Sequence, residues 1–561
     1  MLRDTLSTRA LTARTLAASG MFAPVRPDRA ARALLALRRW GPTPAAGYAA
    51  SAIRYPDAIA LVDDRGSLTF EDVQRRTNAL AHAWRDAGVA AGDGVAILCR
   101  NHRGLVEATV ACSKLGADAL FLNTAFAGPE LAAVCARERP RVLVYDEEFA
   151  AVVAEAADGR ERYVAWSERA GGGAGEAGAG GAARAGSAAS AAGGVPLLDD
   201  LAESGDASDL PVPDRAGRAV ILTSGTTGPP KGALRRQPAS LAPVAGLLSK
   251  IPLRARERTL IAAPMFHSWG LAHFVIAIAL SSTLVLRRRF DAEATLSAID
   301  EHGATAFVVV PAMLQRILEL GEAAIGRHDL GALRVIAASG SPLPGALATR
   351  VMDVFGDVLY NLYGSTEVAW ATVATPQDLR AAPATAGRPP LGTVVRLYDD
   401  AGDEVVAPGR PGRIFVGSEI VFDGYTNGTR KTVIDGLTSS GDIGHLDAEG
   451  RLYVDGREDE MIVSGGENVF PREVEDVVAR LEGVRDVAVV GVDDERFGRR
   501  LRAFVVRAPG ALLTADEVQE HVRANLARFK VPRDVVFVDA LPRTATGKVL
   551  KRELGSLSTT L

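Results

Sequence analysis

The sequence predicts an α/β protein with a large N-terminal domain, made of two βα-layered subdomains and a small β subdomain, followed by a C-terminal α+β domain. Three observations predict this class. Apolar runs of strand length alternate with helical periods in two long blocks, short strands separated by turn residues come next, and the last hundred or so residues combine helices and strands of their own. The length of 561 residues leaves room for three or four units of about 150 residues.

The two blocks of alternation lie between Leu68 and Glu147 and between Val220 and Leu362. Helical stretches separate the apolar runs in both blocks, which is the pattern of βαβ units around a parallel sheet. The expected strands are Val95–Cys99, Ala119–Leu122, Val142–Tyr145, Val220–Leu222, Leu260–Ala263, Phe307–Val310, Val335–Ala338 and Leu359–Leu362. Each block therefore predicts one βα-layered subdomain.

Two segments break this alternation. The segment 171–194 holds ten glycines and ten alanines in 24 positions, and this composition is too poor in large apolar side chains to build a core. We expect it to form a flexible surface insertion. Between Gly387 and Gly456, short strands such as Val394–Tyr398 alternate with turn residues, which predicts the small β subdomain.

The C-terminal part has the signals of a compact α+β unit. Pro471 opens a helix with an apolar stripe, and Gly483 is placed to end it. A buried strand is expected at Val487–Val490, and Thr514 with Glu517 forms a capping box for a further helix. The expected divisions of the chain are a basic N-terminal extension at 1–50, the large domain at 51–457 and the C-terminal domain at 458–561.

Composition excludes several classes of function. The 64 basic and 68 acidic residues give a net charge of -4, so the chain offers no broad positive surface for nucleic acid. The three cysteines, Cys99, Cys112 and Cys135, lack the close pairing of metal or redox sites and suggest a reducing compartment. Small-molecule chemistry is the better expectation.

Basic charge is concentrated at the start of the chain. Residues 1–40 contain eight arginines against Asp4 and Asp28, so this extension either touches anionic lipid or forms a solvated lead-in helix on the first domain. Its arginine-rich start also resembles an organellar presequence, whereas a secretory signal is not convincing. The longest apolar run, Leu271–Leu286, is too short to span a bilayer. We expect a cytoplasmic protein, with peripheral membrane contact left open.

The sharpest local motif is TSGTTGPPKG at Thr223–Gly232, directly after the expected strand Val220–Leu222. Its backbone N–H groups and hydroxyls suit phosphate oxygens, and Lys231 adds a positive charge. The loop differs from the common P-loop because its glycines are too close together and because Pro229 and Pro230 stand where that motif enters its helix.

Lysine is scarce in this chain. Only seven of the 64 basic residues are lysine, so this chain strongly favours arginine. A lysine in such a chain suggests that its position needs a compact ammonium group. Lys231 and Lys548 are the candidates for such a role. Chance or a solvated surface position is the preferred explanation for Lys114 and Lys250.

Five motifs in order carry a family resemblance. They are TSGTTGPPKG at 223–232, YGSTE at 363–367, SGD at 440–442, GREDEMIVSGGENVFPREVE at 456–475 and PRTATGK at 542–548. Together they resemble the acyl-adenylate-forming superfamily of AMP-forming acyl-CoA synthetases, luciferases and adenylation domains. The similarity extends from about Pro56 to Glu553, and some segments resemble bacterial medium- and long-chain fatty acyl-CoA synthetases.

The resemblance implies two half-reactions, in which ATP and a carboxylate give an acyl-adenylate and pyrophosphate, and a thiol then displaces AMP. Expected catalytic residues are Lys548, which would stabilise charge at the α-phosphate, and His267, Thr366 and Glu367. The expected nucleotide-binding residues are Thr223, Ser224, Gly225, Thr226, Thr227 and Lys231 at the phosphates, Tyr363 and Gly364 at adenine, Asp442 and Arg457 at the ribose, and Ser339, Gly340 and Ser341 beside adenine and the acyl carboxylate. Glu367 and Thr226 would hold Mg²⁺, a hard cation that prefers oxygen ligands.

The resemblance also implies a mobile C-terminal domain that turns about Asp459. After the turn, Lys548 would leave the active site, and Ser464, Gly465 and Gly466 would admit the thiol of CoA because they lack bulk. Asn468 belongs to the same expected cofactor-binding set. ATP, Mg²⁺ and CoA are therefore the expected cofactors and co-substrates.

The substrate is less well defined by the sequence. The stretch from Pro264 to Leu280, and Val368–Trp370 after the YGSTE motif, are expected pocket walls without charged residues, which favours an alkyl or aryl acid. A medium- or long-chain fatty acid is the first interpretation. The alternatives are an adenylating ligase for an aryl acid or a carrier protein, and a catalytically silent regulator that binds an acyl-adenylate. The expected partners are the small acid, ATP and CoA, without nucleic acid; the oligomeric state is open.

Overall fold

The computed structural model describes residues 2–157, 159–168, 194–223, 231–235, 240–420, 422–464, 467–494 and 498–554. The chain divides into two compact units, each described separately below. Unit 1 is Met1–Val309, Arg316–Ala337 and Ser418–Arg430, and unit 2 is Val310–Gln315, Ala338–Gly417 and Lys431–Leu561. The predicted insertion 171–194 lies outside the described residues except for Gly194, and the domain boundaries predicted at 50 and 457 stay predictions.

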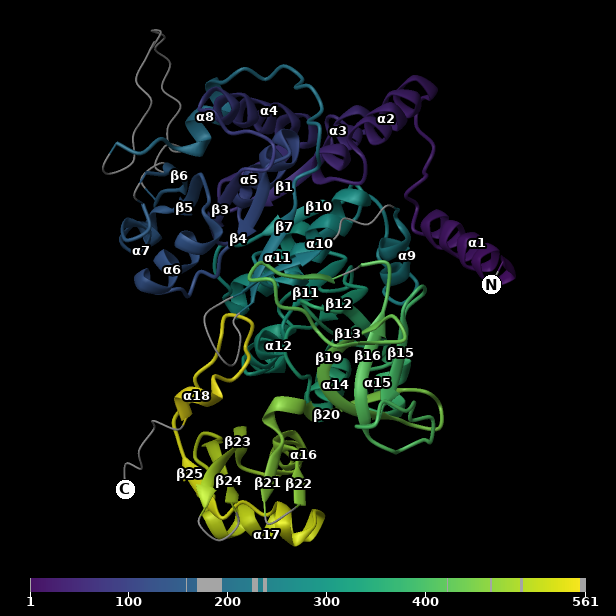
Figure 1. Ribbon diagram of the computed structural model, residues 1–561, viewed down its shortest axis with the longest axis vertical. Helices are drawn as coiled ribbons and strands as arrows, with labels where there is room; N and C mark the ends of the chain where they lie inside the picture. Colours follow the sequence, from purple (N-terminus) through teal and green to yellow (C-terminus); the bar gives the residue numbers. More distant parts are fainter. Residues whose placement is uncertain are drawn as a thin grey trace. The chain divides into compact units, whose positions relative to one another are not determined.

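Unit 1 contains two sheets with mainly parallel strands (Figure 1). In the first sheet the order is β12 (Val335–Ala338), β11 (Ala306–Val309), β9 (Arg258–Ile261), β10 (Thr283–Leu286), β1 (Ile59–Asp63) and β2 (Gly66–Thr69). In the second it is β17 (Phe422–Tyr425), β8 (Lys231–Arg235), β7 (Ala219–Thr223), β4 (Asp118–Phe121), β3 (Gly94–Leu98), β5 (Val142–Asp146) and β6 (Glu161–Trp166). Strands β4, β3, β5 and β6 pair in parallel, as the alternation predicts.

The helices of unit 1 pack beside these sheets or on one another. They are α1 (Leu2–Ala18), α2 (Pro27–Trp40), α3 (Pro44–Arg54), α4 (Phe70–Asp86), α5 (Arg103–Leu115), α6 (Gly128–Glu138), α7 (Ala150–Ala154), α8 (Leu198–Ser204), α9 (Ala242–Leu248), α10 (Ser268–Ala279), α11 (Ala292–His302) and α13 (Glu322–Ile325). A 3-10 turn, Glu147–Phe149, precedes α7, and α12 (Pro311–Leu318) joins the two units along the chain.

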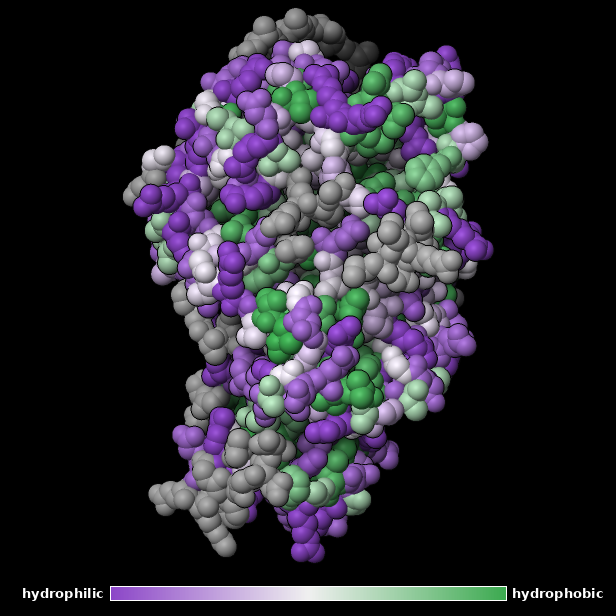
Figure 2. Space-filling view, turned by 45° about the vertical axis from the view of Figure 1, so that its right-hand side comes forward, coloured by the Kyte–Doolittle hydropathy of each residue, from purple (hydrophilic) through white to green (hydrophobic). Residues whose placement is uncertain are grey.

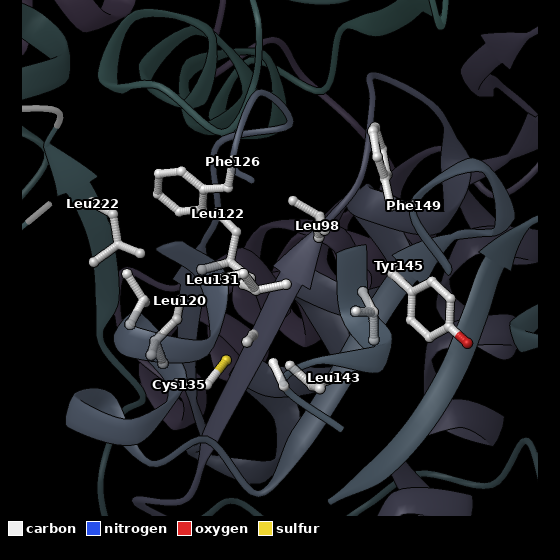
Figure 3. Close-up of a cluster of buried hydrophobic side chains, with 14 of the residues drawn as sticks. Leu98, Leu120, Leu122, Phe126, Leu131, Cys135, Leu143, Tyr145, Phe149 and Leu222 are labelled. Carbon is white, nitrogen blue, oxygen red and sulfur yellow. The ribbon is translucent and has the colours of Figure 1, made fainter. Parts of the chain in front are cut away.

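A core forms where the second sheet meets α6. Figure 3 shows Leu98, Leu120 and Leu143, from the neighbouring strands β3, β4 and β5, together with Leu131 and Cys135 of α6. All five side chains are buried. Burial of this apolar surface is what holds the βα layer together.

Lys114 corrects a sequence-based expectation. A surface position is expected for it, but its side chain is 2% exposed between α5 and α4. The ammonium donates to Thr77 Oγ1 at 2.8 Å and to Asn78 Oδ1 at 2.5 Å, and burial lowers its pKa to about 7. The acceptors compensate for the cost of removing the amine from water.

Unit 2 contains a hairpin, two antiparallel-based sheets and their helices. The hairpin is β13 (Leu359–Ser365) with β14 (Ala369–Ala374); the first sheet is β15 (Val394–Tyr398), β16 (Gly412–Gly417), β19 (Leu437–Leu446) and β18 (Val433–Ile434), with β20 (Leu452–Arg457) on β19. The second sheet is β22 (Glu467–Val469), β21 (Ile462–Ser464), β24 (Gly498–Arg507) and β23 (Val484–Asp494), with β25 (Asp534–Phe537) on β24. The helices are α14 (Gly345–Phe355), α15 (Pro376–Ala381), α16 (Pro471–Val478), α17 (Ala515–Asn525) and α18 (Lys551–Leu554), with 3-10 turns η3 (Glu458–Glu460) and η4 (Arg528–Lys530).

These elements confirm the α/β class with a C-terminal α+β part. The capping box at Thr514 and Glu517 is present at the start of α17. Gly483 differs from its prediction: α16 already ends at Val478, and Gly483, with φ of 87°, lies in the turn before β23. In the described part of the chain, no helix is both long and apolar enough to cross a membrane.

Candidate active site

Asp442 and Arg457 face each other in unit 2. They are direct partners across the antiparallel pair β19–β20, and Arg457 Nε lies 3.8 Å from Asp442 Oδ1. The same guanidinium donates to both carboxylate oxygens of Asp459, at 3.0 and 3.2 Å. Burial works against the charge of Arg457, but Asp459 and Asp442 together raise its pKa. The expected ribose pair and the expected hinge residue thus form one ionic group.

Tyr363 joins this group from β13. Its hydroxyl donates to Asp442 Oδ2 at 2.5 Å. Burial, with the adjacent Asp442 carboxylate, holds the pKa of Tyr363 well above its usual value, so the phenol stays protonated and acts as a donor. The sequence-predicted adenine residue and ribose residue are therefore in direct contact.

Asp442 sits among cations. Asp442 is 8% exposed, and this burial raises the pKa of its carboxyl. The hydrogen bond from Tyr363 and the positive charges of three neighbours oppose the rise; the three are Arg457, Lys548 and Lys431. The influence of Lys548 is notable because this lysine lies 106 positions further along the chain. Lys431 is a residue that the sequence reasoning missed: its Nζ approaches within 3.2 Å of where a Cβ on Gly441 would lie.

The loop that carries Lys548 is rigidly built. The amide N–H of Gly547 donates to the carbonyl oxygen of Thr544 at 2.8 Å. The amide N–H of Lys548 donates to the hydroxyl of the same threonine at 3.1 Å. Gly547 has φ of 80°, and a Cβ there would lie 2.8 Å from the Cβ of Ala312 and 4.0 Å from Ser341 Oγ. Glycine is needed at this position for both the backbone conformation and the close approach.

This loop lies beside the segment 339–341. Gly340 also has a positive φ, 93°, and a Cβ on it would meet Val310 at 3.4 Å and Thr546 at 3.8 Å. Ser339, at the end of β12, is buried. Unit 2 therefore brings the Lys548 loop, the Ser339–Ser341 segment and the Tyr363–Asp442–Arg457 group together.

The YGSTE motif forms the end of β13 and the turn that follows. A Cβ on Gly364 would lie 1.9 Å from the carbonyl oxygen of Ala369, so glycine is required here by the close approach of β14. Ser365 Oγ accepts the amide of Glu367 at 3.2 Å, which fixes the turn. Thr366 and Glu367 are half-buried and offer oxygen donors, the chemistry that Mg²⁺ prefers.

In unit 1, the expected phosphate loop connects two paired strands. Thr223, the last residue of β7, pairs with Lys231, the first residue of β8. A strand therefore follows the loop, where the common P-loop has a helix, which confirms the distinction drawn from the prolines. The Lys231 ammonium lies 5.6 Å from the ring centroid of Tyr425. Side chains of Ser224, Gly225, Thr226 and Thr227 lie outside the described residues.

His267 is the N-cap residue of α10 and lies against the ring of Phe266. Its ring lies 4.6 Å from that of Phe266, and burial lowers its pKa to about 4, so the imidazole is neutral near pH 7. Its Nε2 atom is buried and has no hydrogen-bond partner among the described residues. An orphaned polar atom of this kind is costly unless a ligand meets it.

Two more buried side chains of α10, Trp269 and His273, lie in the stretch that the sequence predicts as a pocket wall. Trp269 Nε1 donates to the carbonyl oxygens of Val309 and Ala337 at 3.2 and 3.3 Å, which fixes the indole. The His273 ring lies 4.1 Å from Trp269, edge to face. Burial lowers the pKa of His273 to about 4, and its Nε2 is likewise without a partner in the described structure.

The expected thiol-binding segment lies in the C-terminal sheet of unit 2. Ser464, 8% exposed, ends β21 and pairs with Glu467 of β22 and with Gly498 of β24. Asn468 pairs with Val463 in the same hairpin. Gly465 and Gly466 lie outside the described residues.

One buried cluster elsewhere has the side chains of a metal site. Ligand atoms of Cys99, His102 and Asp146 lie within 4.8 Å of one another. However, His102 Nδ1 accepts the amide of Gly104 at 3.0 Å and Nε2 bonds Asp146 Oδ1 at 2.7 Å, so both ring nitrogens are already used. His102 serves as the N-cap of α5, and Asp146 holds its ring.

Comparison with known proteins covers most of the chain. Residues 48–426 match the family described as AMP-binding enzyme, and residues 473–548 match the AMP-binding enzyme C-terminal domain. Feruloyl-CoA synthase of Amycolatopsis sp is 35% identical over 510 residues, which cover 89% of this chain and 96% of that protein. The long-chain-fatty-acid–CoA ligase FadD13 of Mycobacterium tuberculosis is 30% identical over 493 residues, covering 87% and 92%.

A solved structure agrees with this match. The o-succinylbenzoate CoA synthetase of Bacillus subtilis, in complex with its acyl-adenylate intermediate, superposes with a TM-score of 0.76 at 26% identity. The alignment covers 91% of this chain and 97% of that one.

Proposed function

Because the chain belongs to the family of AMP-binding enzymes, we propose that it activates a carboxylic acid with ATP and transfers the acyl group to CoA. In the first step a carboxylate oxygen attacks the α-phosphorus, and the bond to pyrophosphate breaks. In the second step the CoA sulfur attacks the acyl carbonyl, the thiol proton leaves, and AMP departs. The acyl-adenylate links the two steps.

The grouping in unit 2 is the observation that carries this proposal. Lys548 contributes to the electrostatic environment of Asp442, which Tyr363 contacts directly. With AMP held by Tyr363, Asp442 and Arg457, the Lys548 ammonium would stabilise the charge that develops on the α-phosphoryl group. Binding and charge stabilisation would thus be performed by one group of residues.

The remaining adenylation residues have distinct proposed tasks. Lys231 and the hydroxyls of Thr223–Thr227 would hold the outer phosphates. Thr366 and Glu367, with Thr226, would hold Mg²⁺, which neutralises phosphate charge when bound. His267, neutral and with an orphaned nitrogen, would meet the acyl carboxylate as a hydrogen-bond donor.

The thioester step requires a different arrangement of the C-terminal part. Asp459 is bound to Arg457 through two hydrogen bonds, and rotation about Asp459 would break or redirect them. The hinge would then remove Lys548 and bring the segment 464–466 to the acyl-adenylate. This alternation accounts for two reactions at one site.

For the acid, we propose an aromatic carboxylate that carries a hydrogen-bonding group. Trp269 and His273 give the α10 wall an aromatic face, and the orphaned His273 Nε2 suits a substrate hydroxyl or carbonyl. The similarity to a feruloyl-CoA synthase supports an aryl acid. Gly270 does not support a tunnel for a fatty chain, because a Cβ there would lie 2.5 Å from the Pro264 carbonyl oxygen, so its smallness is required by the fold.

A medium- or long-chain fatty acid is the second candidate. The otherwise apolar α10 and the similarity to FadD13 favour it. A carrier-protein acceptor is a variant of the same chemistry, and a silent acyl-adenylate-binding regulator is disfavoured because such a protein would not need Lys548.

A panel of acids tests these candidates. ATP–pyrophosphate exchange would be measured with hydroxycinnamic, indole, benzoic and C8–C18 fatty acids, with and without CoA, and thioester would be scored separately. We expect exchange and CoA-dependent thioester with hydroxylated aryl acids. Turnover of fatty acids alone would replace the aryl proposal, and the absence of exchange with every acid would favour the regulator.

A further inference from the structure

Large hydrophobic side chains are exposed at the start of the chain. Twelve such side chains are exposed in the described structure, and five of them lie between residues 11 and 37. They are Leu11 at 48%, Phe22 at 63%, Leu34 at 56%, Leu35 at 64% and Leu37 at 43% exposed. Single exposed hydrophobic residues are common, but three large ones on a single helix, Leu34, Leu35 and Leu37 of α2, mark an interaction surface.

Helix α2 places its larger hydrophobic residues outside. Ala33 is its buried residue, on the side that packs against α3, while the three leucines face outward. Because a helix turns about 100° per residue, Leu34, Leu35 and Leu37 share one arc of about 160°. A helix whose only task is to pack on the protein would bury its leucines and expose its alanines.

Arginines flank this apolar arc. Arg32 and Arg39 lie on the neighbouring arc of α2, and Arg38 lies within the apolar arc itself. Their long side chains place the guanidinium groups at the rim of an apolar surface while the stems lie along it. Figure 2, turned by 45° from the view of Figure 1, shows hydrophobic and hydrophilic residues side by side on the upper part of the molecule.

The charge of this region is strongly positive. In residues 8–40 the arginines are Arg9, Arg14, Arg26, Arg29, Arg32, Arg38 and Arg39, and the acidic residue is Asp28. Asp28 forms ion pairs with Arg26 at 3.2 Å and with Arg32 at 3.6 Å. The remainder of the chain is net negative, so the positive charge is specific to this region.

These helices are also separate from the part of the chain that carries the proposed chemistry. The match to the AMP-binding family begins at residue 48, after α1 and α2. Adenylation therefore does not account for their exposed leucines and arginines.

We propose that the outward face of α2 forms a docking surface for a bilayer that contains anionic lipid. The three leucines enter the boundary between headgroups and acyl chains, and the arginines of α2 bind the lipid phosphates. An acidic protein would satisfy the arginines but leaves the large apolar arc unexplained. A second copy of the chain would cover the leucines but brings the same positive charge against itself.

Vesicle flotation tests this proposal. The full chain would be floated with phosphatidylcholine vesicles and with vesicles that also contain phosphatidylglycerol, at low and high salt. We expect binding to the anionic vesicles, weakened by salt, and on the order of tenfold less binding to phosphatidylcholine alone. Replacing the three leucines, L34S, L35S and L37S, should lower binding to anionic vesicles by about tenfold or more.

The controls separate docking from unrelated effects. A matched variant, V394S with V406S and L512S, removes three other exposed hydrophobic side chains and should bind like the original chain. ATP–pyrophosphate exchange or circular dichroism verifies that each variant is folded. If the leucine variant is unfolded, R38Q with R39Q, at exposed positions, tests the contribution of positive charge to vesicle binding. Equal flotation of the leucine and original chains overturns the proposal, as does failure of the original chain to bind anionic vesicles. A change in oligomer mass without a change in flotation assigns the surface to a second copy.

Discussion

Replacing Tyr363 with phenylalanine removes a single oxygen atom from the candidate nucleotide site and keeps the aromatic ring. That oxygen donates to Asp442 Oδ2 at 2.5 Å and thereby stabilises the ionised carboxylate. Burial already raises the pKa of Asp442, and the Tyr363 hydrogen bond opposes the rise. The Tyr363→Phe variant should therefore have an Asp442 pKa that is higher still.

The size of this effect follows from the strength of the bond. A hydrogen bond to a charged group contributes about 1.5–3 kcal/mol, and one pKa unit corresponds to about 1.4 kcal/mol. The loss of the hydroxyl should thus raise the Asp442 pKa by about one to two units. Protonation would turn one of the two acceptor oxygens of Asp442 into a donor, so nucleotide binding should weaken as the pH falls through the raised pKa.

The assay is the pH dependence of kcat/KM for ATP, together with AMP binding by calorimetry. We expect the acid limb of both profiles to move upward by about one to two pH units in Tyr363→Phe. Tyr398→Phe is a matched control, since its buried phenol donates at 2.9 Å to Asp435, which has no proposed role at the nucleotide. Superimposable profiles for Tyr363→Phe and the original chain would refute the coupling between Tyr363 and Asp442.

Three further substitutions test the site. Lys548→Ala should slow acyl-adenylate formation about a hundredfold or more while a supplied acyl-adenylate is still converted to thioester, and equal loss of both steps would contradict the alternation. Gly465→Leu should spare ATP–pyrophosphate exchange and block thioester formation; undiminished acyl-CoA production would exclude the proposed thiol route. Gly364→Ala would place a Cβ 1.9 Å from the Ala369 carbonyl oxygen and should lower the free energy of unfolding by about 1–3 kcal/mol, as measured by denaturant titration; an unchanged midpoint would show that β14 can yield.

Local patterns predict the fold well in this chain. Strand-length runs such as Val95–Cys99 correspond to β3, and the capping box at Thr514 marks the start of α17, because both signals depend on neighbouring residues. The family motifs likewise name Tyr363, Asp442 and Arg457, which the structure brings together. Their roles stay predictions until measured.

Contacts between distant segments are what the sequence could not supply. The sequence predicts a surface position for Lys114 because a lone lysine in a helix is usually solvated. Its hydrogen-bond acceptors on α4 lie 36 to 40 positions earlier in the chain, so no local pattern reveals them. Lys431 was missed for the same reason, since it belongs to no motif, and His273 was included only as one position of a predicted pocket wall. Their significance comes from the atoms around them, Asp442 in one case and Trp269 in the other.

In the hairpin of β19 and β20, the strand register fixes the positions of Asp442 and Arg457, whereas the turn at the tip contains no candidate site residue. Asp442 and Arg457 are held opposite each other by the ladder, and inserting one residue within either strand would turn a side chain to the opposite face. The tip, from Asp447 to Arg451, is closed by its own hydrogen bonds, and Glu449 and Gly450 are exposed. A short epitope or fluorophore tag placed between those two residues would leave the strand register intact, which makes the tip a practical attachment point for labelling this protein.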